Sequence, residues 1–327
     1  MRTLLFILLL LLASHALGQE VTPPGQPDSG PGGSGDYVYD AVKVTSYGEG
    51  ADRYWVFEPD VEVATPLPIV LYVHGLNAIT PAMNRGWINH LVRRGAIVIY
   101  PAYQTVGLVD PRTFTDKAAQ AAVEAIARLN GTDHARGDTQ RFALAGHSLG
   151  GTISANLAAA HAAYKLPKPK ALMSIEPGDT RADQGLGALL PSLAEDHTTL
   201  PRGLLMLVIA GEEDGIVGMG MAKRIFNAAT QIPDEDKDFV VIRSDRHGRP
   251  ALVADHFIPA SRIVEGGRVD ADALDYYGLW KPFDALMDAA FHGRNREYAL
   301  GNTPEQRYMG TWSDGKPVIE MVVTDEP

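Results

Sequence analysis

The chain of 327 residues contains no cysteine. This absence excludes disulfides, thiolate metal ligands, a cysteine nucleophile and a thiol-linked lipid anchor. An excess of positive charge is also lacking, since 40 Asp and Glu against 29 Lys and Arg leave a formal net charge of −11. An acidic chain is not attracted to the phosphate backbone, so we expect no nucleic-acid partner.

Patterns that bind metals or cofactors are missing too. None of the ten histidines forms a His-x-x-x-His pair, and no Gly-x-Gly-x-x-Gly follows the first predicted parallel strand. We therefore expect no bound metal and no cofactor.

Only one long apolar run is present, in the leucine-rich residues 3–12. It is shorter than the about 20 residues that span a bilayer, and small residues follow it, which indicates a secretory signal peptide over residues 1–18. We expect a secreted or periplasmic protein without stable membrane insertion. Residues 19–35 are rich in Pro, Gly and Ser and predict a disordered linker. Residues 36–327 then form a single domain.

Strand and helix patterns alternate through this domain. Two β-prone segments on either side of a glycine turn predict an antiparallel edge, and short apolar runs between helical patterns predict buried parallel strands. The edge segments are residues 37–45 and 53–57, the buried strands 67–74, 96–100, 142–145, 171–175, 204–210 and 239–243, and the helices 116–129, 152–163 and 271–291. This order predicts an α/β fold with a doubly wound, mostly parallel sheet, antiparallel N-terminal edge strands and helices on both faces. Ligands then bind beyond the carboxyl ends of the strands.

One apolar run ends in Gly-His-Ser-Leu-Gly at residues 146–150. This Gly-x-Ser-x-Gly spacing is typical of a nucleophile elbow, a sharp strand-to-helix turn that leaves no room for side chains two positions before and after the serine. Ser148 is therefore the candidate nucleophile. His147 is expected to pack beneath the elbow, within reach of a substrate.

Three motifs occur in the order found in the α/β-hydrolase superfamily: His74-Gly75 after one strand, the Ser148 elbow after a later one, and an acid and a histidine after further strands. Over residues 36 to about 291 the chain resembles this superfamily, and more narrowly its secreted esterase, lipase and cutinase-like polyester hydrolase branch. The resemblance implies an α/β-hydrolase fold and a Ser-His-Asp triad.

Asp214 matches the position of the family's triad acid, in the loop after the strand at 204–210. Its neighbours Glu212 and Glu213 are interpreted as solvated loop charges. A more distant alternative for the acid is the turn at residues 176–179, Glu-Pro-Gly-Asp, because some family members take their acid there.

Two histidines follow the last predicted strand. His247 lies at the short distance from the strand that is usual in this fold, whereas His256 lies in Ala-Asp-His-Phe-Ile-Pro, which resembles the cutinase-type segment that carries the catalytic histidine. We favour His256 as the base and keep His247 as the alternative.

The resemblance also assigns the oxyanion hole to the backbone N–H groups of Leu76 and Leu149, after the first parallel strand and after the nucleophile. His74, Gly75 and Tyr103 lie at strand ends and are expected to contact the substrate together with His147. Near the C-terminus, residues 309–319 contain an Asp-Gly turn and predict a hairpin-like extension.

These features predict a serine hydrolase that cleaves carboxylic esters through an acyl-enzyme intermediate, acting on a small-molecule or polymeric ester. Two alternatives stay open. The same triad cleaves amides, and a catalytically silent binding protein can share the fold. The sequence leaves the acyl chain length and the oligomeric state undetermined.

Overall fold

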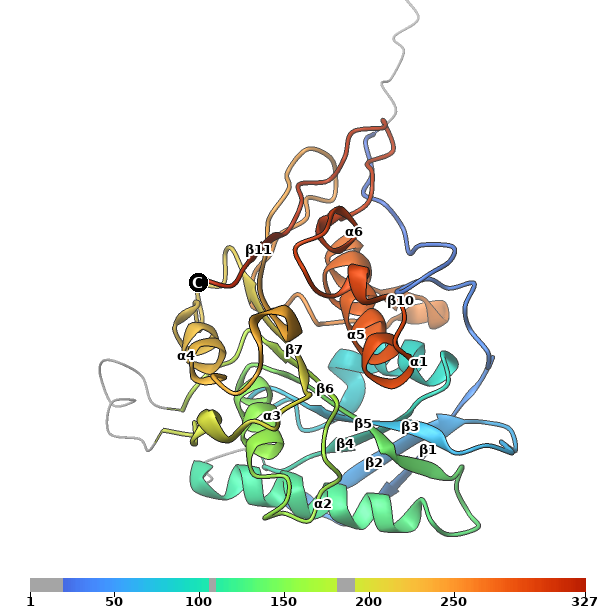
Figure 1. Cartoon of the computed structure of the whole chain (residues 1–327). Coiled ribbons are helices and arrows are strands. Elements are labelled where there is room, and N and C mark those ends of the chain that lie inside the picture. The colour runs from blue at the N-terminus through green and yellow to red at the C-terminus, as the bar shows by residue number, and fades with distance from the viewer. Residues whose placement is uncertain (1–19, 106–109, 181–191) are drawn as a thin grey trace, which may run out of the picture.

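A nine-stranded sheet forms the centre of the computed structural model, which describes residues 20–105, 110–180 and 192–327. The strand order is β1-β2-β4-β3-β5-β6-β7-β8-β11 (Figure 1). The strands are β1 Val42–Tyr47, β2 Tyr54–Pro59, β3 Leu67–Val73, β4 Ile97–Pro101, β5 Gly137–His147, β6 Ala171–Ile175, β7 Leu205–Gly211, β8 Lys237–Ile242 and β11 Val322–Thr324. A separate two-stranded ribbon pairs β9 Arg262–Ile263 with β10 Val269–Asp270.

The direction of the strands confirms the predicted sheet. Neighbours from β4 through β3 to β8 run parallel, whereas β1 with β2 and β2 with β4 run antiparallel at the N-terminal edge. The sequence pattern missed β11, which pairs antiparallel with β8 at the other edge. Its three residues are too few for a visible alternation of polar and apolar side chains.

Helices cover both faces of the sheet (Figure 1). On one face α2 Phe114–Arg128, α3 Leu149–Ala159 and α4 Gly220–Ala228 share a hydrophobic core, and on the other α1 Arg85–Arg93 and α5 Lys281–His292 share a second core. A short helix, α6 Pro304–Arg307, lies near the C-terminus. Within the described residues, no helix has both the length and the apolarity to cross a bilayer. The expected signal peptide, residues 1–18, lies outside the described residues.

The helix predicted over residues 271–291 is divided in two. Leu274–Trp280 is a π-helix, and α5 begins directly after it. Pro282 lies in the first turn of α5 and has no N–H, so the regular helical hydrogen-bond ladder is interrupted at this point. The pattern correctly predicted a buried helical segment and missed its change of pitch.

Residues 20–35 lie against the domain, in contrast to the disordered linker expected from their composition. Arg249 donates its backbone N–H to the carbonyl oxygen of Val21 at 2.8 Å, and the backbone N–H of Gly32 donates to the Asp284 carboxylate at 2.7 Å. Pro31 and Gly32 are buried. The segment lacks large apolar side chains, but it is held through its backbone groups, which a composition argument does not consider.

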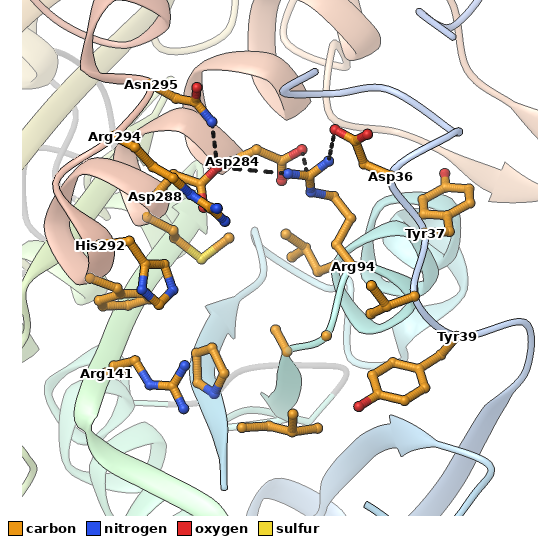
Figure 2. A pocket seen from close by; sticks show the side chains of 18 of the residues that line it. Asp36, Tyr37, Tyr39, Arg94, Arg141, Asp284, Asp288, His292, Arg294 and Asn295 are labelled. Atoms are coloured by element: carbon orange, nitrogen blue, oxygen red, sulfur yellow. Dashed lines mark hydrogen bonds and ion pairs between the residues drawn. The ribbon is translucent and has the colours of Figure 1, made fainter. Parts of the chain in front are cut away.

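A polar cavity of about 660 Å³ lies beside this segment and the start of β3 (Figure 2). Arg94 projects toward it between Asp284, at 3.0 Å, and Asp36, at 3.4 Å. Burial alone would raise the pKa of the Asp284 carboxyl, but His90 and Arg94 outweigh it and lower that pKa. These charges compensate one another and connect the N-terminal segment to α1 and α5.

Candidate functional site

Ser148 lies on the turn between β5 and α3, at the carboxyl end of the sheet. Its backbone has φ 57° and ψ −126°, a conformation that residues other than glycine rarely adopt. The flanking glycines make the turn possible. A β-carbon at Gly146 would overlap the carbonyl oxygen of Gly150, and one at Gly150 would overlap the carbonyl oxygens of Val73 and His74. The structure therefore forms the elbow that the Gly-x-Ser-x-Gly spacing predicts.

His256 joins Ser148 to Asp214 in one line of hydrogen bonds. Its Nε2 lies 3.0 Å from Ser148 Oγ, and its Nδ1 lies 2.8 Å from Asp214 Oδ2. All three side chains are buried. They come from the end of β5, the loop after β7 and the loop after β8, so segments far apart in the sequence meet at one point.

The loop after β7 holds Asp214 in place. Its Oδ1 accepts the backbone N–H groups of Ile216 at 2.9 Å and Val217 at 3.0 Å. These bonds stabilise the charged carboxylate and leave Oδ2 for the imidazole. The neighbouring Glu213 forms a surface ion pair with Arg246, in line with the interpretation of its carboxylate as a loop charge.

The alternative base, His247, lies elsewhere. Its Nε2 lies 2.7 Å from Asp314 Oδ2 in the C-terminal turn, and its ring packs against Trp312. In that turn Thr311 and Pro317 form an antiparallel bridge, and the buried Trp312 donates its Nε1–H to Asp245. The short distance from β8 therefore does not bring His247 to Ser148, because residues after β8 first turn toward the C-terminal segment before they reach Ser148.

A cavity of about 520 Å³ opens in front of Ser148. Its apolar lining includes Met83, Val217 and the strongly exposed side chains of Leu76, Ile216 and Phe257, with exposed fractions of 60%, 64% and 56%. The cavity thus offers an apolar surface that continues to the outside of the molecule. An apolar group of a ligand fits this environment.

The four residues expected to contact a substrate divide into two pairs. Gly75 and His147 line the cavity, but His74 and Tyr103 do not. Both of the latter are fully buried, and their rings stack with centroids 4.2 Å apart. Tyr103 donates its hydroxyl to the carbonyl oxygen of His74 at 2.7 Å. The prediction that His74 and Tyr103 contact the substrate directly is therefore wrong. This buried pair instead supports the loop that carries Gly75.

Leu76 and Leu149, the two positions expected for an oxyanion hole, line the same cavity as Ser148. Leu149 is the first residue of α3, so its N–H has no acceptor inside the helix, and the partial positive charge of the helix N-terminus lies there. A β-carbon at Gly75 would approach Ser148 Cβ to 3.0 Å. Glycine at this position lets the backbone before Leu76 come close to the nucleophile.

Glu176 is the residue whose position sequence reasoning did not foresee. It follows β6, is completely buried, and its Oε2 lies 3.4 Å from His147 Nε2 and 4.0 Å from His256 Nδ1. Burial, followed by the negative charge of Asp214, raises the pKa of the Glu176 carboxyl to about 9. The only signal in the sequence was an acidic residue at the end of an apolar strand, in the turn considered as an alternative source of the acid.

His147, Glu176 and His256 also form the one His, Asp and Glu cluster among the described residues with ligand atoms close enough for a metal ion, within 4.8 Å of one another. However, His147 Nε2 already donates to the His256 carbonyl oxygen at 2.8 Å, and His256 Nδ1 faces Asp214. Burial lowers the pKa of His147 to about 4, so its ring is neutral. The two imidazoles of the cluster are therefore already engaged in hydrogen bonds within the protein.

The family model described as Chlorophyllase, an α/β-hydrolase-type serine esterase family, matches residues 35–196, just under half of the chain. This range includes the elbow and the loop with Gly75 and ends before Asp214. No curated protein matches the chain significantly.

Proposed function

We propose that this chain is an exported serine esterase of the α/β-hydrolase superfamily that forms an acyl-enzyme on Ser148, in line with the match of residues 35–196 to a serine esterase family model. The observation that carries the proposal is the hydrogen-bonded line of Ser148, His256 and Asp214, with distances of 3.0 and 2.8 Å. Such a line supplies a nucleophile, a base and an orienting carboxylate.

The reaction begins when His256 Nε2 accepts the proton of Ser148 Oγ while Oγ forms a bond to the acyl carbon. Asp214 keeps the proton of His256 on Nδ1 and stabilises the imidazolium. The bond to the alkoxy oxygen then breaks, and His256 returns its proton to this leaving group. Water, deprotonated by the same imidazole, releases the acid and restores Ser148.

The backbone N–H groups of Leu76 and Leu149 stabilise the negative charge on the carbonyl oxygen of the tetrahedral intermediate. Two observations support this role: both residues line the cavity beside Ser148, and Leu149 lies at the N-terminus of α3. The loss of one such donor typically lowers kcat by about 10²- to 10³-fold. The strained backbone of Ser148 thus presents the nucleophile to the acyl carbon and the N–H group of Leu149 to the carbonyl oxygen bonded to that carbon.

The apolar lining of the cavity supports an acyl or alcohol group of low polarity as the substrate class. Small and polymeric esters both meet this requirement, since the exposed Leu76, Ile216 and Phe257 extend the apolar surface beyond the cavity.

Hydrolysis of p-nitrophenyl acyl esters should be at least about 10³-fold faster, in kcat/KM, than hydrolysis of aminoacyl p-nitroanilides, because the apolar cavity offers few polar partners for a peptide backbone. Initial rates on the two series with one purified preparation, with the chain length varied among the esters, measure this ratio. Comparable rates on both series would identify an amidase instead. A rate on esters equal to that of a Ser148→Ala control would contradict the proposal.

Export is proposed from the leucine-rich leader alone. Cleavage after Gly18 makes Gln19 the first residue of the mature protein. Edman sequencing or mass spectrometry of the protein from the exported fraction of an expressing cell checks this. A mature chain that still begins at Met1 would contradict it.

A further inference from the structure

Two carboxyl groups, rather than one, face the imidazole of His256. Asp214 Oδ2 lies 2.8 Å from Nδ1, and Glu176 Oε2 lies 4.0 Å from the same nitrogen. Asp214 comes from the loop after β7, whereas Glu176 follows the neighbouring strand β6, so the two carboxyls reach the ring from adjacent strands of the sheet. The hydrogen-bonded line of Ser148, His256 and Asp214 includes only the first of these carboxyls.

The environment of the Glu176 carboxyl lowers the stability of the folded protein. Its side chain is completely buried, and neither carboxyl oxygen has a hydrogen-bond partner. Its backbone has φ 43°, a left-handed conformation that is unfavourable for a residue with a β-carbon. Opposite it, a β-carbon at Gly211 would come within 2.5 Å of Oε1, so glycine at the end of β7 makes room for the carboxyl. Burial without partners and backbone strain together point to a role beyond packing.

The charges around Glu176 decide its protonation state. The titratable groups that face it are His147 at the end of β5, Asp214 after β7, Asp255 and His256 after β8, and Tyr72 on β3. Asp214 and Asp255 disfavour a second negative charge, His256 favours it, and burial disfavours it most. Glu176 therefore keeps its proton at neutral pH, since these causes raise its pKa to about 9.

We infer that Glu176 is a positioning residue that takes over the role of Asp214 toward His256 when the Asp214 carboxylate is removed. The inference rests on the proposed function, because it assigns a second acid to the same base. Without Asp214, the charge that opposes ionisation of Glu176 is lost. Glu176 then releases its proton at a lower pH than in the wild type, and its carboxylate accepts the Nδ1–H of His256.

The required movement is small. The distance of 4.0 Å must shorten by about 1 Å to reach a hydrogen bond, and removal of the Asp214 side chain provides the space. His147 keeps Glu176 on the correct side, since its Nε2 lies 3.4 Å from Oε2 and also donates to the His256 carbonyl oxygen. The imidazole of His147 thus lies between the backbone of His256 and the carboxyl of Glu176.

The test is a double-mutant cycle on a soluble short-chain ester. Removal of a triad carboxylate typically lowers kcat by about 10⁴-fold, but we expect Asp214→Ala to lower it by only about 10²-fold, and Asp214→Ala/Glu176→Gln by a further 10- to 100-fold. Glu176→Gln alone lowers kcat by less than about tenfold, because Asp214 still orients the ring. Asp214→Ser, which retains a hydroxyl for the loop, repeats the comparison should the alanine variant unfold.

The pH profile separates positioning from packing. In Asp214→Ala the rise of kcat with pH should move to higher pH than in the wild type, because activity then requires the Glu176 proton to leave, and this rise should disappear in the double variant. Glu213→Gln provides a matched control: it also converts a carboxylate to an amide, in the loop of Asp214, but its side chain pairs with Arg246. Asp214→Ala/Glu213→Gln should behave as Asp214→Ala does.

Equal kcat values and equal pH profiles for Asp214→Ala and the Glu176 double variant overturn the inference. This failure is distinct from failure of the proposed function, since loss of activity in Ser148→Ala and His256→Ala would still stand. If Ser148→Ala retains activity, the proposed function and this inference fall together.

Discussion

Replacing His256 by alanine lowers kcat for a soluble short-chain ester by about 10⁴-fold or more, whereas replacing His247 by alanine changes it by less than about threefold. His256 is the imidazole within hydrogen-bond distance of Ser148, and without it the serine hydroxyl has no base. His247 is bound to Asp314 in the C-terminal turn and lies outside the cavity lining. Initial rates at saturating substrate measure both effects.

The comparison requires that both variants fold. His247→Ala serves as the matched control, because it removes the same side chain from the same stretch after β8 and loses the partly exposed contacts with Asp314 and Lys316. Circular dichroism and thermal unfolding verify the fold of each variant. Equal losses in the two variants, or a larger loss for His247→Ala, would contradict the assignment of the base.

Replacing Ser148 by alanine has the largest effect expected of any single substitution, a loss of about 10⁶-fold in kcat. The acyl-enzyme cannot form without Oγ, and the remaining rate comes from substrate binding and stabilisation of the oxyanion. Alanine at this position removes one atom, keeps the β-carbon and leaves the flanking glycines unchanged, so the elbow should persist. Single-turnover and steady-state rates with a p-nitrophenyl ester measure the loss.

The decreases in kcat caused by Ser148→Ala and by His256→Ala should not multiply in the double variant. Because the two groups act as one unit, Ser148→Ala/His256→Ala should be no slower than Ser148→Ala alone within about threefold. Multiplicative losses in the double variant would mean that His256 contributes by a route independent of Ser148. That result would contradict the proton transfer proposed between them.

The sequence predicted those parts of the candidate site that depend on local geometry. Gly146 and Gly150 are required by the turn itself, so a five-residue pattern was enough to predict the elbow that carries Ser148. Asp214 followed from its place after a buried strand and its match to the family position. Each of these signals lies within a few residues, where backbone sterics determine the outcome.

Features that depend on distant packing were not accessible in the same way. The choice between His247 and His256 depends on the C-terminal segment, where Asp314, 67 residues downstream, binds the ring of His247. Glu176 looks like an ordinary loop acid until Gly211 and His147 are seen around it. Both are tertiary effects that spacing along the chain does not encode.

Two parts of the fold could not be predicted from the sequence for the same reason: the order of the N-terminal segment and the strand at the C-terminal edge of the sheet. Residues 20–35 have a disordered composition, yet Asp284 accepts the backbone N–H of Gly32 from across the domain. The strand β11 is recognisable only through its pairing with β8. Parallel strands with their long apolar runs were predictable because burial on both faces selects the same residue types in every such strand.

The most direct measurement is covalent labelling of the purified enzyme with a fluorophosphonate, followed by peptide mass spectrometry. We expect a single adduct, on the peptide that contains Ser148, formed together with loss of esterase activity. Labelling should be absent in Ser148→Ala and strongly slowed in His256→Ala. An enzyme that hydrolyses esters while Ser148 stays unlabelled, or that remains active when it is labelled, would contradict the account.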